Sequence, residues 1–550
     1  MKMSGAQIVV EQLCSHGAET VFGYPGGAIL PLYDELYKNA SRINHVLTAH
    51  EQGAAHAADG YARTAGKPGV VIATSGPGAT NLVTGIANAY LDSVPMVAIT
   101  GNVAVPLLGR DSFQEVDIVG ITLPIVKHSF EVREAEKLEE IMNEAFYIAN
   151  SGRRGPVLVD IPKSVQADVC EYSGKQQPME EDKRPPEYDL EHIAKTIAQS
   201  KRPFIYAGGG VLASGAENEL RALSERLSAP VGFSMMGLTA LPDDYELNLG
   251  MCGMHGKYAA TVAQSECDLM IALGVRFSDR ATGDTDVYKQ EKTIIHVDID
   301  LAEIGKNVAA QTDVCGDIKE VLTELLKVLF PMRSDEWLAR IGELKHNEAP
   351  CKNGGFSPCG IIKTVGRYCD EDTMIATDVG QHQMWVMQSY KFMKPRTLLT
   401  SGGLGAMGYG LGAAIGSCMA NGRKRTVLFT GDGSFGMNLI ELATAVSQKL
   451  PIVIVILNNN ALGLPRQWQN MFYGGRYSQS TLDRKTDFAV VAEAFGAEGR
   501  TASTLAGLEA AMESLPDDHP IVIDCRIGAD EQAFPMIPPG GSVKNMVLGG

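Results

Sequence analysis

Short runs of β-branched and other apolar residues alternate with segments of helical periodicity along most of the chain. Runs such as 70–73 and 96–100 are bounded by Gly or Pro, which is typical of strands buried on both faces of a parallel sheet. Residues 81–91 have helical spacing, and Ser4 and Gln7 have the spacing of a capping box. The pattern predicts an α/β protein. Further strands are predicted at 157–161, 203–207, 269–273, 294–299, 427–430, 452–457 and 521–525.

Two stretches interrupt this rhythm. Residues 174–188 are rich in Lys, Gln, Glu and Pro, and residues 349–358 contain Pro, Asn and paired Gly, compositions that are typical of linkers. They divide the chain into three segments of ordinary domain size. The first and last segments share the same alternation, so we expect related folds. The sequence thus predicts three doubly wound, mostly parallel-sheet domains at 1–170, 190–345 and 355–550.

The composition disfavours some classes of binding partner. Asp and Glu number 65 and Lys and Arg 48, so the net charge is −17, which disfavours nucleic acid as a partner. The longest aliphatic run, 452–457, is far shorter than the ~20 residues of a membrane-spanning helix. The N-terminus lacks the pattern of an export signal. We expect a cytoplasmic protein with no membrane partner, whose ten scattered cysteines are mostly small buried thiols.

The strongest local signal is Gly431-Asp432-Gly433-Ser434, which follows a predicted strand and precedes a predicted helix at 439–446. Free backbone amides at a helix start favour phosphate, and a carboxylate is a hard oxygen ligand for Mg²⁺. The next strand ends in Asn458-Asn459-Asn460, whose amide oxygens could complete the site. Adjacent parallel strands end at the same edge of a sheet. A lone G-D-G is most often a structural turn, but this pairing predicts a magnesium-diphosphate site.

This G-D-G followed by N-N resembles the signature of the thiamin-diphosphate enzymes. The resemblance implies that Asp432, the Asn459 side chain and the Ala461 carbonyl bind Mg²⁺. It implies a bent cofactor supported by Met407 and by the Gly405 carbonyl; the alternative is a glycine-rich helix start packed by Met407. The further cofactor contacts that it implies are Gly380, Gln381, His382, Gly433 and Ser434.

Glu51, in His50-Glu51-Gln52, matches the glutamate that protonates the cofactor's pyrimidine in this family. Such a carboxyl needs a mainly apolar pocket that raises its proton affinity. Taken alone, a Glu at a helix start is usually an N-terminal capping charge. The resemblance makes 1–170 the pyrimidine-binding domain and 355–550 the diphosphate-binding domain. Because these domains meet across a subunit interface in the family, we expect a homodimer or a dimer of dimers.

Ordered segments across nearly the whole chain resemble the acetohydroxyacid synthase (acetolactate synthase) catalytic subunits. The resemblance implies decarboxylation of pyruvate on thiamin diphosphate and ligation of the two-carbon unit to a second 2-keto acid. Pyruvate then gives 2-acetolactate and 2-ketobutyrate gives 2-aceto-2-hydroxybutyrate, the first common step of branched-chain amino-acid biosynthesis. The matching segments are 23–27, 74–81, 113–117, 160–163, 253–256 and 467–469, and they contribute Phe113, Gln114, Lys163 and Trp468 as candidate catalytic residues.

Arg280 resembles the arginine that holds the acceptor carboxylate, and Trp468 the residue that lines the acceptor pocket, although Trp468 could be only a core aromatic. The family's central domain holds FAD, and a small regulatory subunit is a possible partner. The residues that match the FAD contacts are Arg153, Gly208, Gly209, Gly210, His255, Arg276, Asp298 and Asp317.

Three alternatives share the signature: a thiamin- and FAD-dependent pyruvate oxidase, a flavin-free catabolic acetolactate synthase, and a scaffold that binds the cofactor without turnover. The chain departs from the family at Ser278 and at Leu464-Pro465. Proline fixes its own backbone angle and restricts the residue before it, so we expect the loop over the acceptor to sit differently. The sequence therefore constrains the choice of acceptor 2-keto acid less than it constrains the type of reaction.

Overall fold

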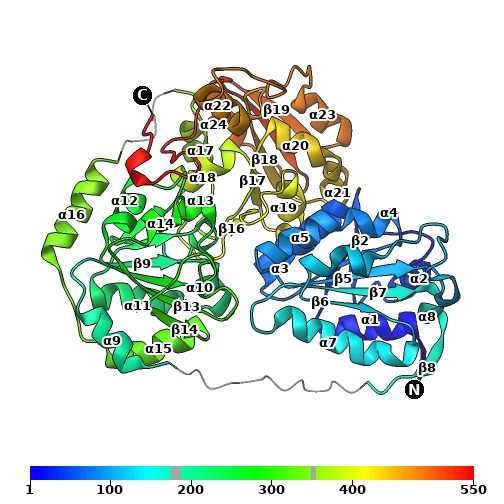
Figure 1. The fold of residues 1–550 in the computed structure, drawn as a ribbon. Coiled ribbons are helices and arrows are strands. Elements are labelled where there is room, and N and C mark those ends of the chain that lie inside the picture. The colour runs from blue at the N-terminus through cyan, green and yellow to red at the C-terminus, as the bar shows by residue number, and fades with distance from the viewer. Residues whose placement is uncertain (175–187, 349–354, 550) are drawn as a thin grey trace.

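The computed structural model describes residues 1–174, 188–348 and 355–549, and it contains three six-stranded parallel sheets with helices on their faces (Figure 1). These sheets confirm the predicted fold class. The two predicted linkers fall largely outside the described residues. No helix within those residues is both long and apolar enough to cross a bilayer.

The sheet of the first domain has the order β3-β2-β4-β5-β7-β6. Its strands are β2 (Thr20–Tyr24), β3 (Asn44–Leu47), β4 (Gly69–Ala73), β5 (Met96–Asn102), β6 (His128–Glu131) and β7 (Pro156–Pro162), and a separate ribbon pairs β1 (Lys2–Ser4) with β8 (Val169–Glu171). Its helices are α1 (Gly5–Ser15), α2 (Leu30–Lys38), α3 (Glu51–Ala65), α4 (Pro77–Asn81), α5 (Val83–Leu91), α6 (Ile118–Thr122), α7 (Leu138–Asn150) and α8 (Lys163–Ala167).

The central sheet has the order β11-β10-β9-β12-β13-β14. Its strands are β9 (Pro203–Ala207), β10 (Val231–Phe233), β11 (Asn248–Met251), β12 (Leu269–Leu273), β13 (Thr293–Asp298) and β14 (Thr312–Cys315). Its helices are α9 (Leu190–Ala198), α10 (Gly209–Ser214), α11 (Glu217–Leu227), α12 (Tyr258–Glu266), α13 (Asp279–Thr282), α14 (Thr285–Tyr288), α15 (Ile318–Val328) and α16 (Asp335–His346).

The third sheet has the order β16-β15-β17-β18-β20-β19. Its strands are β15 (Met374–Thr377), β16 (Leu398–Leu399), β17 (Thr426–Gly431), β18 (Ile452–Asn458), β19 (Glu498–Ala502) and β20 (Ile521–Arg526). Its helices are α17 (Pro358–Gly366), α18 (Gln381–Ser389), α19 (Tyr409–Ala420), α20 (Asp432–Asn438), α21 (Leu442–Ser447), α22 (Gly463–Phe472), α23 (Phe488–Phe495) and α24 (Leu505–Met512).

The outer domains are topological copies of each other. Counted within each domain, both sheets run second, first, third, fourth, sixth, fifth strand, which confirms the predicted kinship. The central sheet has a different order, third, second, first, fourth, fifth, sixth strand. Its strand order reverses between β9 and β12, and such a reversal places a crevice outside the carboxyl ends of that pair of strands. Two domain types therefore build the chain.

Successive strand residues point to opposite, equally apolar faces, which explains why these runs read as continuously hydrophobic. In β4, Val70 and Ile72 enter the core beneath α1 and α7, whereas Val71 and Ala73 enter the core that α3 shares with the third domain. A continuously hydrophobic run therefore indicates that both faces of the sheet are buried at that strand.

Local predictions hold with two corrections. Ser4 and Gln7 form the capping box of α1. The helix predicted at 439–446 is wrong in its start, because α20 begins at Asp432 directly after β17 and a 3₁₀ turn leads into α21. The expectation of buried thiols fails at Cys359, which is disulfide-bonded.

Helix α3 of the first domain packs closely against α19 of the third. A Cβ atom added at Gly416 would lie 1.8 Å from the Ala57 carbonyl oxygen, and one at Gly60 would lie 2.2 Å from that of Ala413. Glycine at both positions lets the backbones touch. This contact fixes how the two outer domains are oriented within one chain.

We therefore predict that Gly416→Ala lowers the free energy of the first unfolding transition by about 1–3 kcal/mol, and with it the urea midpoint, because the added methyl forces the helices apart. The matched control is Gly342→Ala in α16, where an added Cβ meets nothing within 4 Å. It should stabilise its helix by up to about 1 kcal/mol. An unchanged midpoint in Gly416→Ala would contradict the close contact.

Candidate functional site

Three segments meet at one edge of the third sheet. Strands β15, β17 and β18 are parallel neighbours, and they are followed by the segments that begin at Asp378, Asp432 and Asn459, of which the second is helix α20. The hydroxyl of Ser434 donates to the Val379 carbonyl oxygen at 2.7 Å and so joins two of these segments. The structure thus brings together the segments that the sequence singled out separately.

Asp432 and Asn459 are buried and in contact. The backbone amide of Asn459 donates to the Asp432 carboxylate, and burial raises the pKa of that carboxyl to about 6. The Asn459 side-chain oxygen accepts from the Ala461 amide at 3.1 Å, which fixes the amide orientation. A carboxylate, an amide oxygen and a nearby backbone carbonyl form the hard oxygen set that suits Mg²⁺.

His382 and Gln381 lie beside these oxygens at the start of α18. His382 is 4% exposed, and its Nε2 atom has no hydrogen-bond partner among the described residues. Burial lowers the pKa of His382 to about 3, so the ring is neutral at ordinary pH. The amide nitrogen of Gln381 is already used, because it donates to Gln467 Oε1 and to the Glu531 carbonyl. Of the pair, His382 has the free hydrogen-bonding atom.

Asp378 braces the segment that contains Gly405 and Met407. Its carboxylate accepts from the backbone amides of Val379 and Gly408, each at 2.8 Å, and burial raises its pKa to about 6. Asn438 donates to the Gly408 carbonyl from the other side. Sequence reasoning did not assign Asp378 a role, although an acid directly after a buried strand was a signal for one.

Met407 reaches over the G-D-G turn. A Cβ added at Gly433 would lie 2.7 Å from Leu462 Cδ2 and 3.9 Å from the Met407 methyl, so the turn packs closely against Leu462 and leaves no room for a side chain. The oxygen set and the unpaired His382 nitrogen fit a magnesium-bound diphosphate.

A buried charge cluster from the first domain holds the same segment. Arg63 pairs with Asp59 at 2.6 Å and with Asp92 at 2.9 Å, and Tyr409 donates to Asp59. Asp92 accepts from the amides of Gly402 and Gly403. These contacts are far apart in sequence, so no local pattern signalled them.

Glu51 begins α3 and is 8% exposed. Asn81 Nδ2 donates to its carboxylate at 2.9 Å, and a Cβ at Gly78 would lie 3.2 Å from it. The preceding amides of Ala49 and His50 are held by Glu441 of the third domain. The structure therefore places Glu51 against α4, and among the described residues its carboxylate shares no hydrogen bond with Asp432, Asn459 or Ala461.

Phe113, Gln114 and Lys163 lie at the surface of the first domain. Phe113 is 88% exposed, and Gln114 adopts a left-handed backbone with φ of 59°. A Cβ at Gly76 would lie 2.7 Å from the Gln114 carbonyl, so this loop rests on the segment that also contacts Glu51. Lys163 is exposed at the start of α8. Within one chain these three do not join the third-domain site.

Arg280 and Trp468 are in contact across two domains. The guanidinium carbon of Arg280 lies 5.5 Å from the Trp468 ring centroid, and the indole N–H has no partner among the described residues. Pro465 falls in the first turn of α22, where the backbone N–H would have no intrahelical partner. The expected disturbance of this loop is thus absorbed by the start of a regular helix.

The candidate FAD residues gather around the carboxyl edge of the central sheet. Gly208 and Gly210 approach the backbone of Gly274, so chain packing alone accounts for their lack of a side chain. His255 is buried with an unpaired Nδ1 among the described residues, and burial lowers its pKa to about 4. Gly209 lies at the start of α10, and Asp317 caps α15. Asp298 ends β13, and burial raises its pKa to about 6. Arg276 is half-buried, and Arg153 pairs with Asp300 and Glu303.

Family models match all three domains. Residues 3–121, 190–325 and 378–525 match the N-terminal TPP binding domain, the central domain and the C-terminal TPP binding domain of the thiamine pyrophosphate enzymes. The arrangement of matches follows the order of the three sheets.

Curated relatives match over nearly their full length. The "Probable acetolactate synthase large subunit" of Methanocaldococcus jannaschii is 45% identical over 99% of this chain and 95% of the relative. The acetolactate synthase large subunits of Porphyra purpurea and Lactococcus lactis subsp. lactis are 44% and 43% identical, over 99% and 98% of this chain and 95% of each relative. The chain therefore belongs to the thiamine pyrophosphate enzyme family and, within it, to the acetolactate synthase large subunits.

Proposed function

We propose that the chain decarboxylates pyruvate and ligates the two-carbon unit to a second 2-keto acid, either pyruvate or 2-ketobutyrate. The proposal rests on one observation. The chain matches an acetolactate synthase large subunit over 99% of its length, and it holds Glu51, Asp432 and Asn459 in buried, hydrogen-bonded positions. A binding scaffold would not require this combination.

Thiamin diphosphate, when bound, supplies a carbon acid whose conjugate base adds to the 2-keto carbonyl. Asp432, Asn459 and the Ala461 carbonyl would hold Mg²⁺ and the diphosphate, with His382 Nε2 as a further polar contact. Met407 would support the thiazolium from below. Glu51 would hold a proton at the pyrimidine ring nitrogen, and the Asn81 amide would orient its carboxyl.

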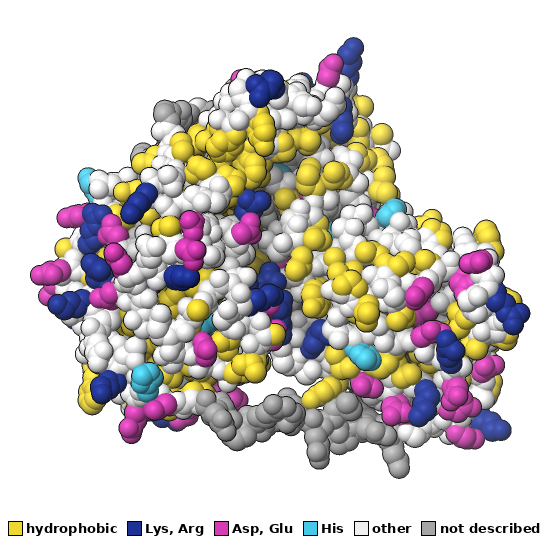
Figure 2. All heavy atoms as spheres, in the orientation of Figure 1, with side chains coloured by type: hydrophobic (Ala, Val, Ile, Leu, Met, Phe, Trp, Pro, Cys, Tyr) yellow, Lys and Arg dark blue, Asp and Glu magenta, His cyan; other side chains and the backbone are white. Residues whose placement is uncertain are grey.

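A second copy of the chain is the partner that the site requires. Among the described residues Glu51 shares no hydrogen bond with the proposed magnesium set, and each lies in a domain with exposed apolar side chains. Figure 2 shows hydrophobic side chains over the third domain and over the adjoining part of the first. Phe113, Leu123 and Met437 are 88%, 67% and 63% exposed. Burying such residues favours a homodimer in which each site takes Glu51 from one subunit and Asp432 from the other.

Arg280 and Trp468 would receive the second 2-keto acid. The guanidinium is suited to its carboxylate, and the indole face to its alkyl group. Their mutual contact sets the spacing between these two functions. Phe113, Gln114 and Lys163 would reach the site from the first domain of the other subunit.

FAD is the third cofactor that we propose, in the central domain. The reversal of strand order between β9 and β12, the unpaired His255 nitrogen and the half-buried Arg276 support a dinucleotide at this edge. Because the names of the relatives specify a large subunit, we also propose a small regulatory subunit as a partner.

Glu51→Gln should lower acetolactate formation from pyruvate by about 10²-fold or more, because an amide cannot supply the proton. Thiamin diphosphate affinity, measured by calorimetry, should stay near that of the wild type. The control is Glu35→Gln, since Glu35 is equally buried at 8% in the same domain but pairs with Lys38. Near-normal turnover in Glu51→Gln would refute the assignment.

Asp432→Asn should weaken Mg²⁺-dependent binding of thiamin diphosphate about tenfold to a hundredfold or more, because the metal loses its charged ligand. Titration of Mg²⁺ into the apoprotein with the diphosphate present measures this. Asp160→Asn is a matched control, since Asp160 is also a buried aspartate near the end of a strand, where burial raises its pKa to about 7, and it lies in the first domain. Equal losses in the two variants would argue for a general structural effect.

Trp468→Leu should lower the ratio of 2-aceto-2-hydroxybutyrate to 2-acetolactate in mixed-substrate assays, because the extra methylene loses an apolar contact worth about 1–3 kcal/mol. Tyr473→Leu, at the end of the same helix, should leave the ratio unchanged. A ratio that shifts equally in both variants would remove Trp468 from the acceptor pocket.

A further inference from the structure

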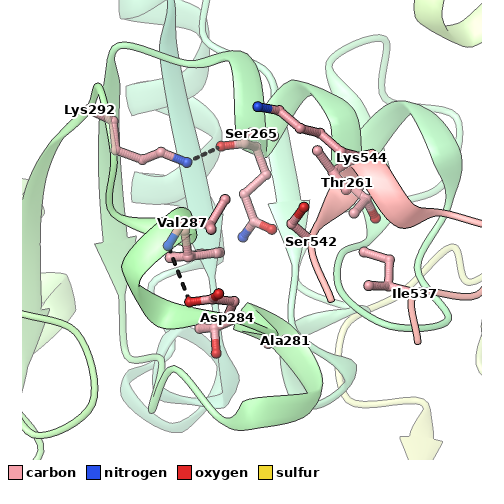
Figure 3. A pocket seen from close by; sticks show the side chains of 13 residues that line it. Thr261, Ser265, Ala281, Asp284, Val287, Lys292, Ile537, Ser542 and Lys544 are labelled. Carbon is pink, nitrogen blue, oxygen red and sulfur yellow. Dashed lines mark hydrogen bonds between the residues drawn. The ribbon is translucent and has the colours of Figure 1, made fainter. Parts of the chain in front are cut away.

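A cavity lies between the central domain and the C-terminal segment (Figure 3). Its volume is about 60 Å³. One wall is α12 with the α13–α14 region, and the other is the segment that follows Ile537. The polar side chains at its surface include Thr261, Gln264, Asp284, Lys292, Ser542 and Lys544.

Two buried polar groups at this cavity lack partners. Gln264 is 2% exposed and Thr261 is 5% exposed, yet the Gln264 amide nitrogen and the Thr261 hydroxyl make no hydrogen bond among the described residues. An unpaired buried polar group is destabilising, because it loses its hydrogen bonds to water. Both groups can donate, so an acceptor in the cavity would satisfy them.

Lys292 adds a buried cation. Its ammonium donates to the Gln264 carbonyl at 2.8 Å and lies 4.9 Å from the Tyr288 ring centroid. No carboxylate pairs with it among the described residues, and a buried ammonium without a counter-charge is costly. Lys544 adds a second cation at the mouth and Asp284 one carboxylate, so the lining has a single net positive charge.

We propose that this cavity is a binding site for a small carboxylate monoanion. The unpaired donors and the buried ammonium select an acceptor with negative charge, and the single net positive charge favours a monoanion over phosphate dianion. The space holds about four to six heavy atoms at roughly 10–15 Å³ for each water-sized position. Ala281, Val287 and Ile537 give an apolar wall for a short alkyl group. A molecule of the size of propionate meets these conditions.

An anion there would join the C-terminal segment to the central domain. The backbone already connects them, since Ile537 donates to the Met254 carbonyl at 2.9 Å and Asp284 to the Gly541 carbonyl at 3.1 Å. Ser542 and Lys544 contribute from the segment, and Gln264 and Lys292 from the domain. Occupancy would therefore reduce the opening of the segment 537–547.

The test uses the full-length holoenzyme saturated with Mg²⁺ and thiamin diphosphate. Calorimetry measures binding of propionate, phosphate and the neutral isostere 1-propanol, and hydrogen exchange measures protection of 537–547. Lys292→Met should weaken propionate binding at this site at least about tenfold and abolish the gain in protection. The matched control Lys289→Met removes an exposed lysine that pairs with Asp286, and it should behave like the wild type.

Propionate at the acceptor site would be unaffected by Lys292→Met and would not protect 537–547, so the two sites are distinguishable. If Lys292→Met does not fold, Lys544→Ala at the surface should still weaken binding about twofold to fivefold. Equal protection by 1-propanol, tighter binding of phosphate, or unchanged propionate binding in the Lys292 and Lys544 variants would overturn the proposal.

Discussion

The contact between α3 and α19 is the constraint on which the rest of the structure depends. Glycine at 60 and 416 lets the two helices touch, and the Asp59–Arg63–Asp92 cluster is buried beside them. Breaking one partner of a buried ion cluster leaves an uncompensated charge. Because Asp92 also holds the amides of Gly402 and Gly403, the same cluster fixes the segment ahead of α19. The same contacts therefore set both the orientation of the two outer domains and the position of the segment ahead of α19.

The two outer domains use equivalent sheet edges for different tasks. In their shared topology β4 corresponds to β17. The loop after β17 brings the Asp432 carboxylate to the sheet edge, whereas the loop after β4 leads to Asn81, which fixes the Glu51 carboxylate. Parallel strands deliver all their carboxyl ends to one side, so a duplicated fold offers two such edges. One edge suits a metal and the other a proton carrier.

Most central strands could be predicted from the sequence, although interior strands such as β10 and β15 were missed, and edge strands could not. The strands β9 and β12 match their predicted ranges, because residues buried on both faces must be apolar. By contrast β19, with the sequence Glu-Gly-Arg-Thr-Ala, lies at a sheet edge and needs few apolar side chains. The closeness of Asp432 and Asn459 was predictable because the two residues follow adjacent parallel strands. The roles of Asp378 and Asp92 were not, since each depends on amides in a segment that only the tertiary structure brings near.

At Leu464-Pro465 the chain differs from the family's motif, and the effect of this difference depends on the backbone structure at that position. Proline in a helix interior removes a hydrogen bond, but the first turn has N–H groups without intrahelical acceptors. Pro465 occupies that turn, and the first closing bond runs from Arg466 to the Leu462 carbonyl at 2.9 Å. Trp468 lies in the next turn, where its ring faces Arg280 from another domain. The Arg280–Trp468 contact therefore depends on packing between two domains as well as on the helix that begins beside Pro465.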